Sequence, residues 1–164
     1  MRALVTGGAK RLGREISLYL AKRGYDVAVH YNSSENEALD VAKEINSQGR
    51  LSECLKCDLL IEDQVKALVP LASEALGGPI SILVNNASIF EHDSFEDATR
   101  ASWDRHMESN LRAPFVLTQA FSKQSPSPIL DKKNEPISQG LVLNMIDQRV
   151  KKLTPDFASY TIAK

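Results

Sequence analysis

The sequence predicts an α/β protein built on a doubly wound parallel sheet. Short, almost continuously apolar segments alternate along the chain with longer amphipathic ones, which is the pattern of strands covered by helices on both faces. A glycine-containing turn, Thr6 to Gly13, joins the first apolar segment to the first amphipathic one. Because such a unit lays dinucleotide phosphates on a helix N-terminus, we expect a Rossmann-type sheet; an ordinary strand-to-helix turn is the alternative.

The expected elements follow from apolar periodicity and from the turn residues that bound each segment. The expected strands are Arg2–Thr6, Asp26–Tyr31, Leu51–Lys56, Ile80–Val84 and Gly140–Met145. The expected helices are Glu15–Arg23, Asn36–Gln48, Glu62–Leu76, Ser102–Ser125 and one that begins near Phe157. We expect Pro114 to kink the long fourth helix, and the polar segment Pro126–Gln139 to be an irregular loop.

The composition is that of a water-soluble cofactor domain. The chain has 164 residues, of which 43% are apolar and 25% charged, with a net charge of −1. This is enough for one core, so we expect a single domain over residues 1–164. A near-neutral net charge without a basic cluster argues against a nucleic-acid partner. We find no signal peptide and no apolar run long enough for a membrane, so the expected location is cytoplasmic.

Cys54 and Cys57 form a C-x-x-C pair to which we assign no redox or metal role. A redox pair needs a helix N-terminus to lower a thiol pKa, whereas these residues fall in an expected strand. Residues three apart on a strand point to opposite faces. No second pair completes a zinc site, so we expect two small, buried or half-buried side chains.

The residues after the second strand indicate which dinucleotide is bound. An acid there favours NAD, but this chain has Tyr31-Asn32-Ser33-Ser34 and no acid until Glu35. Neutral hydrogen-bonding groups, with Lys10 or Arg11 reaching over from the glycine turn, suit the 2′-phosphate of NADPH. Ser33 or Ser34 also suits the N-cap of the next helix, in a capping box with Glu37.

The last residues place Tyr160 and Lys164 four apart on an expected helix, where both side chains lie on one face. A nearby ammonium stabilises phenolate, so we expect Lys164 to lower the pKa of Tyr160 and make it a usable general acid. A solvated helix face is the alternative meaning of this spacing. The pair comes last in an ordered series of motifs along the chain, and this order favours a catalytic meaning of the spacing.

Taken together, these motifs resemble those of the short-chain dehydrogenase/reductase family over all 164 residues. The turn Thr6 to Gly13, the segment Asn85-Asn86-Ala87, Asn110, and Tyr160 with Lys164 carry the resemblance. It implies that Tyr160 donates a proton, that Lys164 tunes it and holds the nicotinamide ribose, and that Asn110 bends its helix and supports a relay water. It also implies a homotetramer, with the long fourth helix as the oligomer face.

The resemblance further implies an NADPH site at the ends of the strands, with Asp58 and Leu59 against the adenine. The cofactor-binding residues expected are Gly7, Lys10, Arg11, Leu12, Tyr31, Asn32, Ser33, Asp58, Leu59, Asn86, Ala87 and Ser88.

Two departures from the family pattern indicate which group within the family the chain resembles most. Arg11 replaces the middle glycine of the turn, and Asp147 replaces the usual catalytic serine. Pteridine reductases, and the bacterial dihydrofolate and dihydromonapterin reductases beside them, share both departures. Their turn resembles T-G-A-A-K-R-L-G and their fifth strand ends in N-M-x-D, as in Asn144-Met145-Ile146-Asp147 here. The resemblance is therefore closest to that group.

The predicted chemistry is hydride transfer to a pterin carbon with protonation of the adjacent nitrogen. Asp147 beside Tyr160 can hold and relay such a proton, although burial and Lys164 would move the pKa of Asp147 in opposite directions. By resemblance, Phe90 stacks on the pterin, Ser88 bonds its edge, and Arg11 approaches both phosphates and substrate. The alternatives are core packing for Phe90 and loop capping for Asp147.

Family members continue well beyond the catalytic lysine. The resemblance therefore predicts that residues 1–164 do not include the rest of the Tyr160 helix, the sixth and seventh strands or the loop that closes over substrate. Without the sixth strand, the fifth would be an unprotected apolar edge. We expect an NADPH-dependent pteridine reductase. A carbonyl reductase acting on a ketone or a 3-oxoacyl thioester, and a non-catalytic fragment that binds NADPH, are the alternatives.

Overall fold

The fold is known from a computed structural model that describes residues 1–126 and 128–164. Its main sheet has five strands in the order β3-β2-β1-β4-β7, and every pairing is parallel. The strands are β1 Arg2–Val5, β2 Asp26–Tyr31, β3 Ser52–Lys56, β4 Ile82–Asn85 and β7 Leu141–Asn144. The predicted parallel sheet is confirmed.

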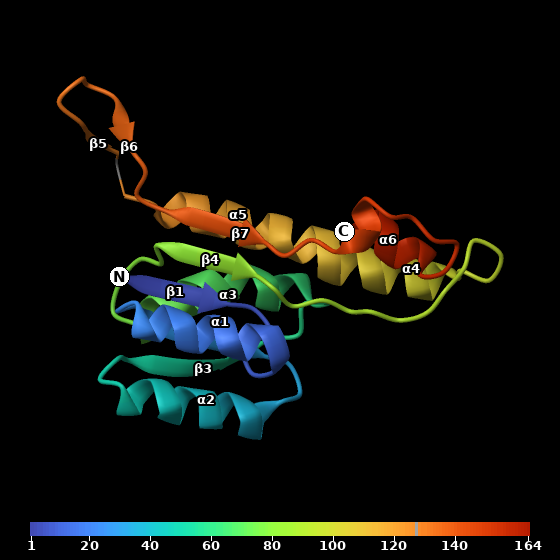
Figure 1. Cartoon of the computed structure of the whole chain (residues 1–164), viewed down its shortest axis with the longest axis horizontal. Helices are drawn as coiled ribbons and strands as arrows, with labels where there is room; N and C mark the ends of the chain where they lie inside the picture. The colour runs from blue at the N-terminus through green and yellow to red at the C-terminus, as the bar shows by residue number, and fades with distance from the viewer. Residues whose placement is uncertain (127) are drawn as a thin grey trace.

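Helices cover both faces of this sheet (Figure 1). They are α1 Arg11–Lys22, α2 Glu35–Ser47, α3 Glu62–Ala75, α4 Arg100–His106, α5 Ala113–Gln124 and α6 Ala158–Ala163. One core cluster joins the sheet to α1 and α2 through residues such as Leu18 and Val41, and the other joins it to α3 and α5 through Leu68 and Leu117. The two clusters are the buried faces of a doubly wound sheet.

The fourth helix differs from the prediction of one helix kinked at Pro114. A π-helical segment, Met107–Arg112, separates α4 from α5, and Pro114 lies in the first turn of α5. A proline is tolerated there because the first amides of a helix have no intrahelical partner. The irregularity therefore comes before the proline. Asn110 lies within it and exchanges two hydrogen bonds of 2.9 Å with the backbone of Ile89.

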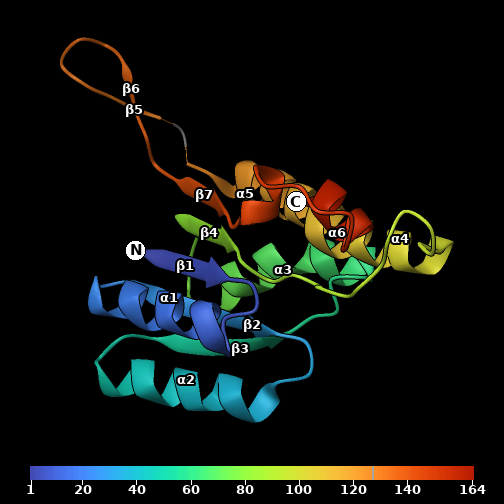
Figure 2. The ribbon, with the colours of Figure 1, turned by 45° about the vertical axis from the view of Figure 1, so that its right-hand side comes forward.

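The expected loop Pro126–Gln139 contains a short antiparallel hairpin, β5 Ile129–Leu130 and β6 Pro136–Ile137. The side chain of Asp131 accepts hydrogen bonds from two backbone amides of its turn. The hairpin projects away from the sheet (Figures 1 and 2). Residue 127 of the predicted loop lies outside the described residues.

Strand β7 forms one edge of the sheet, and Leu141 and Leu143 on it are 52% and 42% exposed. This agrees with the expected apolar edge. Cys54 lies half-buried on β3, and Cys57 lies buried just after it; both are free thiols. In the described part of the chain, no helix combines the length and apolarity that a membrane crossing needs.

Candidate active site

A cleft of about 920 Å³ opens where the strands of the main sheet end. The strand order reverses between β1 and β4, and ligands of open α/β sheets bind at such a switch point. The cleft brings together most of the predicted site residues, namely Gly7, Lys10, Arg11, Leu12, Asn32, Asp58, Leu59, Asn86, Ala87, Ser88, Phe90, Asp147, Tyr160 and Lys164.

Three predicted site residues do not line this cleft. Tyr31 is buried at the end of β2, and Ser33 is exposed just beyond it. Asn110 lines an adjoining cavity of about 390 Å³, which it shares with Lys164. The cleft and this cavity adjoin along the residues that line both, namely Ala87, Met145, Ile146 and Lys164.

The glycine turn is held open by His30, to which the sequence reasoning assigned no role. Gly7 adopts φ +61°, and a Cβ there would lie 3.1 Å from the Cα of Ala87, so the position needs glycine. The amide of Gly7 donates to Nδ1 of His30 at 2.9 Å. Nε2 of His30 is therefore the protonated nitrogen, and it donates to the carbonyl of Cys57 at 3.0 Å. Burial lowers the pKa of His30, which keeps the ring neutral for this arrangement.

A second network joins the turn after β1 to the turn after β4. Thr6 Oγ1 donates to the carbonyl of Val84 at 3.2 Å and accepts from the amides of Asn86 and Ala87 at 2.9 and 3.0 Å. The side-chain amide of Asn86 donates back to the carbonyls of Thr6 and Gly7 at 2.9 and 3.2 Å. The two turns, which line the cleft with Gly7, Asn86 and Ala87, are thus cross-linked.

The start of α1 suits a phosphate group. Lys10 is its N-cap residue and makes no side-chain capping bond, so the lysine side chain leaves the first amides of α1 available beside the cleft. A Cβ on Gly13 would lie 2.0 Å from the carbonyl oxygen of Gly7, so only glycine lets the helix approach the turn this closely. These features fit the pyrophosphate of a dinucleotide.

The predicted capping box at α2 is wrong. Ser34 is the N-cap residue of α2, but its side chain makes no capping bond. Glu37 instead pairs with Lys10, Oε1 to Nζ at 2.6 Å. The lysine that the sequence assigns to the cofactor is therefore held by a carboxylate at the mouth of the cleft.

Tyr160 and Asp147 are in direct contact. The phenol Oη donates to Asp147 Oδ2 at 3.0 Å, while Asp147 Oδ1 accepts from the amide of Arg149 at 2.9 Å. Asp147 therefore caps a 3₁₀ turn with one oxygen, as the loop-capping alternative predicts, and contacts the tyrosine with the other. The bonds from Arg149 and Tyr160 outweigh burial and lower the pKa of Asp147, which favours its ionised form.

The predicted effect of Lys164 on Tyr160 is wrong in this structure. Burial and then the Asp147 carboxylate raise the pKa of Tyr160 to about 12. Nζ of Lys164 donates to the carbonyl of Met145 at 2.8 Å and lies 5.9 Å from the centre of the tyrosine ring. Burial lowers the pKa of Lys164. Burial of the phenol and its contact with the carboxylate therefore set the direction of the shift in the pKa of Tyr160, and the ammonium is bonded to a backbone carbonyl instead.

Phe90 forms an exposed aromatic platform rather than core packing. It is 52% exposed, its ring stacks on Phe157 with centroids 4.2 Å apart, and it meets the edge of Tyr160 at 4.7 Å. The guanidinium of Arg149 lies 4.5 Å from the centre of the Phe157 ring. A flat aromatic group therefore has a matching surface beside the predicted proton donor.

The sheet order and the switch-point cleft define a dinucleotide-binding protein of the Rossmann type. A family model described as short chain dehydrogenase matches residues 1–164. The chain belongs to the short-chain dehydrogenase family, an oxidoreductase family, and the predicted membership is confirmed.

Several solved structures and curated proteins of this family are similar to the chain. Crystal structures of the FolM alternative dihydrofolate reductase 1 from Brucella suis and Brucella canis, both with NADP, are 41% and 42% identical, each with a TM-score of 0.88. They cover 99% of this chain, which covers 63% and 62% of theirs. The 3-oxoacyl-acyl-carrier-protein reductase FabG of Staphylococcus aureus (strain Mu50) is 34% identical over 122 residues, covering 74% of this chain. The chain spans about half the length of the curated relatives it matches, 49% for FabG.

Proposed function

We propose that this chain carries the cofactor site and proton donor of an NADPH-dependent reductase of dihydropteridine-type substrates. The contact between Tyr160 Oη and Asp147 Oδ2, at 3.0 Å, carries the proposal. It places against the proton donor a carboxylate that can hold and relay a proton for a ring nitrogen, where a ketone reductase of this family would have serine. The similarity to the NADP-bound FolM structures supports the same choice.

Bound NADPH would supply the hydride. The amides at the start of α1 would hold its pyrophosphate, and Lys10 or Arg11 its 2′-phosphate. The absence of an acid at the end of β2 supports a phosphate there, because the first carboxylate after the strand is Glu35. Asp58 and Leu59 would lie against the adenine, and Lys164 beside the nicotinamide ribose.

The protein's part of the reaction is delivery of one proton. With a pKa raised to about 12, Tyr160 carries its proton at neutral pH. The raised pKa also makes it a weaker acid, so its proton would leave only as the substrate nitrogen becomes basic on arrival of the hydride. The reduction adds hydride to carbon and this proton to the adjacent nitrogen, which converts C=N into CH–NH. Tyr160 is left as a phenolate, which Asp147 can reprotonate by relay from solvent and Lys164 can stabilise. Phe90 would stack on the pterin ring, with Ser88 at its edge and Arg11 near both substrate and phosphates.

Replacement of Tyr160 by Phe tests this proposal. We expect Tyr160→Phe to abolish NADPH oxidation with dihydrobiopterin and to leave NADPH binding, followed by fluorescence, unchanged. Tyr19→Phe is the matched control, because Tyr19 is 62% exposed on α1, on a part of that helix that does not line the cleft. Undiminished turnover by Tyr160→Phe would reject the assignment of Tyr160 as proton donor.

A carbonyl reductase of the same fold is the second candidate, favoured by the 34% identity to FabG. NADPH oxidation with dihydrobiopterin, compared with oxidation with a β-ketoacyl thioester, separates the two. Binding of NADPH without turnover of either would instead identify a non-catalytic fragment. We also propose that residues 1–164 act as a single cofactor-binding domain and, by family resemblance, that the protein is a homotetramer.

A further inference from the structure

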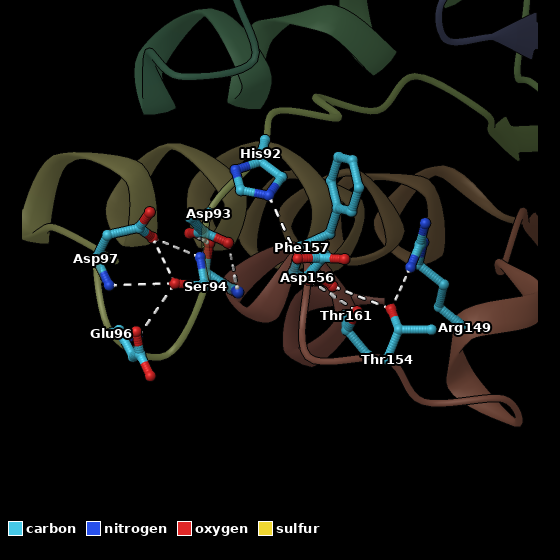
Figure 3. Close-up of polar contacts among 11 residues, drawn as sticks. His92, Asp93, Ser94, Glu96, Asp97, Arg149, Thr154, Asp156, Phe157 and Thr161 are labelled. Carbon is cyan, nitrogen blue, oxygen red and sulfur yellow. Dashed lines mark hydrogen bonds and ion pairs between the residues drawn. The ribbon is translucent and has the colours of Figure 1, made fainter.

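Three buried polar side chains connect the segment after β4 to the catalytic helix α6. Asp93, His106 and Ser159 are only 3%, 0% and 1% exposed. Ser159 Oγ lies between the other two: it bonds Asp93 Oδ2 on one side and His106 Nδ1, at 2.6 Å, on the other. Figure 3 labels Asp93 of this network, together with Phe157 and Thr161 of the segment that forms α6.

Asp93 caps α6 from a distant part of the chain. The N-cap residue of α6, Phe157, has φ 59° and makes no side-chain capping bond. The backbone oxygen of Asp93 instead accepts from the amide of Ala158 at 3.2 Å, and its Oδ1 accepts from the amide of Ser159 at 3.1 Å. Two amides that a helix start leaves without an intrahelical partner are therefore satisfied. Burial opposes ionisation of Asp93, but the bonds from Ser159 outweigh it and lower its pKa.

The hydrogen bonds of this network run in one direction. The amide of Glu91 donates to His106 Nε2 at 3.2 Å, so the histidine proton lies on Nδ1 and is donated to Ser159 Oγ. The serine hydroxyl then donates to the Asp93 carboxylate. These are the residue types of a hydrolytic triad, but here the serine lies between the other two and all three are buried. The serine is thus unavailable as a nucleophile.

The network joins the two segments that form the reaction site. Ser159 directly precedes Tyr160, and Asp93 lies three residues after Phe90, whose ring meets the tyrosine ring at 4.7 Å between centroids. The His106 ring also meets the Tyr160 ring edge-on, at 6.0 Å. We propose that Asp93, Ser159 and His106 are positioning residues, an inference that rests on the proposed function. They hold Tyr160 beside Phe90, in the place from which it can donate its proton to a substrate stacked on that ring.

Asp93→Asn tests the proposal because it keeps the shape and reverses one hydrogen bond. Asn Oδ1 can still accept from the Ser159 amide, but its NH₂ group now faces Ser159 Oγ. The serine oxygen can accept from both this NH₂ group and His106 Nδ1, but its own hydroxyl proton then loses the acceptor that the Asp93 carboxylate supplied. A buried donor is left without a partner, so the junction loosens.

The matched control is Asp97→Asn, the same change on the same loop (Figure 3). Asp97 is exposed, and its Oδ1 accepts from the amide and hydroxyl of Ser94. Ser159→Ala is the milder second variant, which removes the hydroxyl and keeps the helix cap. It decides the outcome if Asp93→Asn does not fold.

We expect Asp93→Asn to lower kcat by about tenfold or more, because small displacements of a reacting group cost rate steeply. The KM for dihydrobiopterin and the Kd for NADPH should stay as in the wild type. Amide hydrogen exchange over residues 158–163 should quicken, and the pKa of Tyr160 should fall as the phenol leaves Asp147. Asp97→Asn should change none of these.

Unchanged kcat in Asp93→Asn and Ser159→Ala overturns the positioning role, even if hydrogen exchange quickens. Absence of wild-type turnover with dihydrobiopterin counts against the proposed function alone. In that case amide hydrogen exchange over residues 158–163 and the pKa of Tyr160 decide the inference. If both are the same in Asp93→Asn as in Asp97→Asn, the positioning role is overturned.

Discussion

The hydroxyl of Thr6 cross-links the turns after β1 and β4, which line the cleft, so its removal should cost stability and cofactor affinity together. Thr6→Val keeps the shape of the side chain and deletes one donor and two acceptor contacts. Thr6 is only 2% exposed, so water has little access to replace it. The substitution therefore tests a hydrogen-bonding role with little change in packing volume.

The cost follows from what each partner retains. Val84 O still accepts from the Thr6 amide at 3.0 Å, and the Asn86 amide still donates to Val84 O at 3.1 Å. The Ala87 amide loses the acceptor that Thr6 supplied. One unpaired, partly buried N–H costs about 1–3 kcal/mol, and the weakened Asn86 bond adds a fraction of that. We expect a loss of about 2 kcal/mol in unfolding free energy, or roughly 4–8 °C in Tm for a chain of this size.

Urea unfolding followed by circular dichroism measures the free energy, and fluorescence titration measures the NADPH Kd. Thr118→Val is the matched control, because its hydroxyl makes a single bond to Pro114 O one helical turn back. We expect that control to stay within about 0.5 kcal/mol of wild type. NADPH binding should weaken in Thr6→Val only. A Thr6→Val protein as stable as the control would refute the role assigned to this hydroxyl.

Three further outcomes are expected. Asp147→Asn should lower the pKa of Tyr160 from about 12, since it removes a negative charge that disfavours the phenolate; an ultraviolet titration corrected with Tyr160→Phe measures this, and an unmoved curve contradicts it. Glu37→Gln should release Lys10 and tighten NADPH binding by about two- to fivefold, a modest effect because the Lys10–Glu37 ion pair is exposed. NADH binding should stay unchanged, and equal effects on both cofactors would exclude a contact between Lys10 and the 2′-phosphate. Cys57, whose pKa burial raises to about 11, should react slowly with a disulfide reagent at pH 7 and faster as pH rises; rapid labelling at pH 7 would contradict its buried position.

Several elements of the fold could be predicted from local patterns. Strand β2 has the predicted bounds, and β1 ends one residue earlier than expected, because buried parallel strands are continuous apolar runs. Helix α1, by contrast, begins at Arg11 rather than Glu15. The first turn of α1 was not predicted because it contains Gly13, and glycine is a weak helix former. That glycine is required by contact with Gly7, which periodicity does not record.

The candidate site was predictable as a set of residues but not as a set of interactions. Each motif follows a strand, and parallel strands end at one edge of the sheet, so the motifs had to meet there. The sequence reasoning assigned no role to His30 or Asp93, because each is one polar residue among many. What distinguishes them is burial with a distant partner, as in the bond between Asp93 and Ser159, 66 residues apart.

The sequence by itself determined the alternation of strands and helices, the glycine turn and the placement of Tyr160 and Lys164 on one helix. These depend on local backbone geometry and on periodicity along the chain. Only the tertiary structure decided that the pKa of Tyr160 is raised rather than lowered, and that Lys10 is paired with Glu37. The physical reason is that desolvation and charge interactions depend on distances through space, which spacing along the chain does not specify.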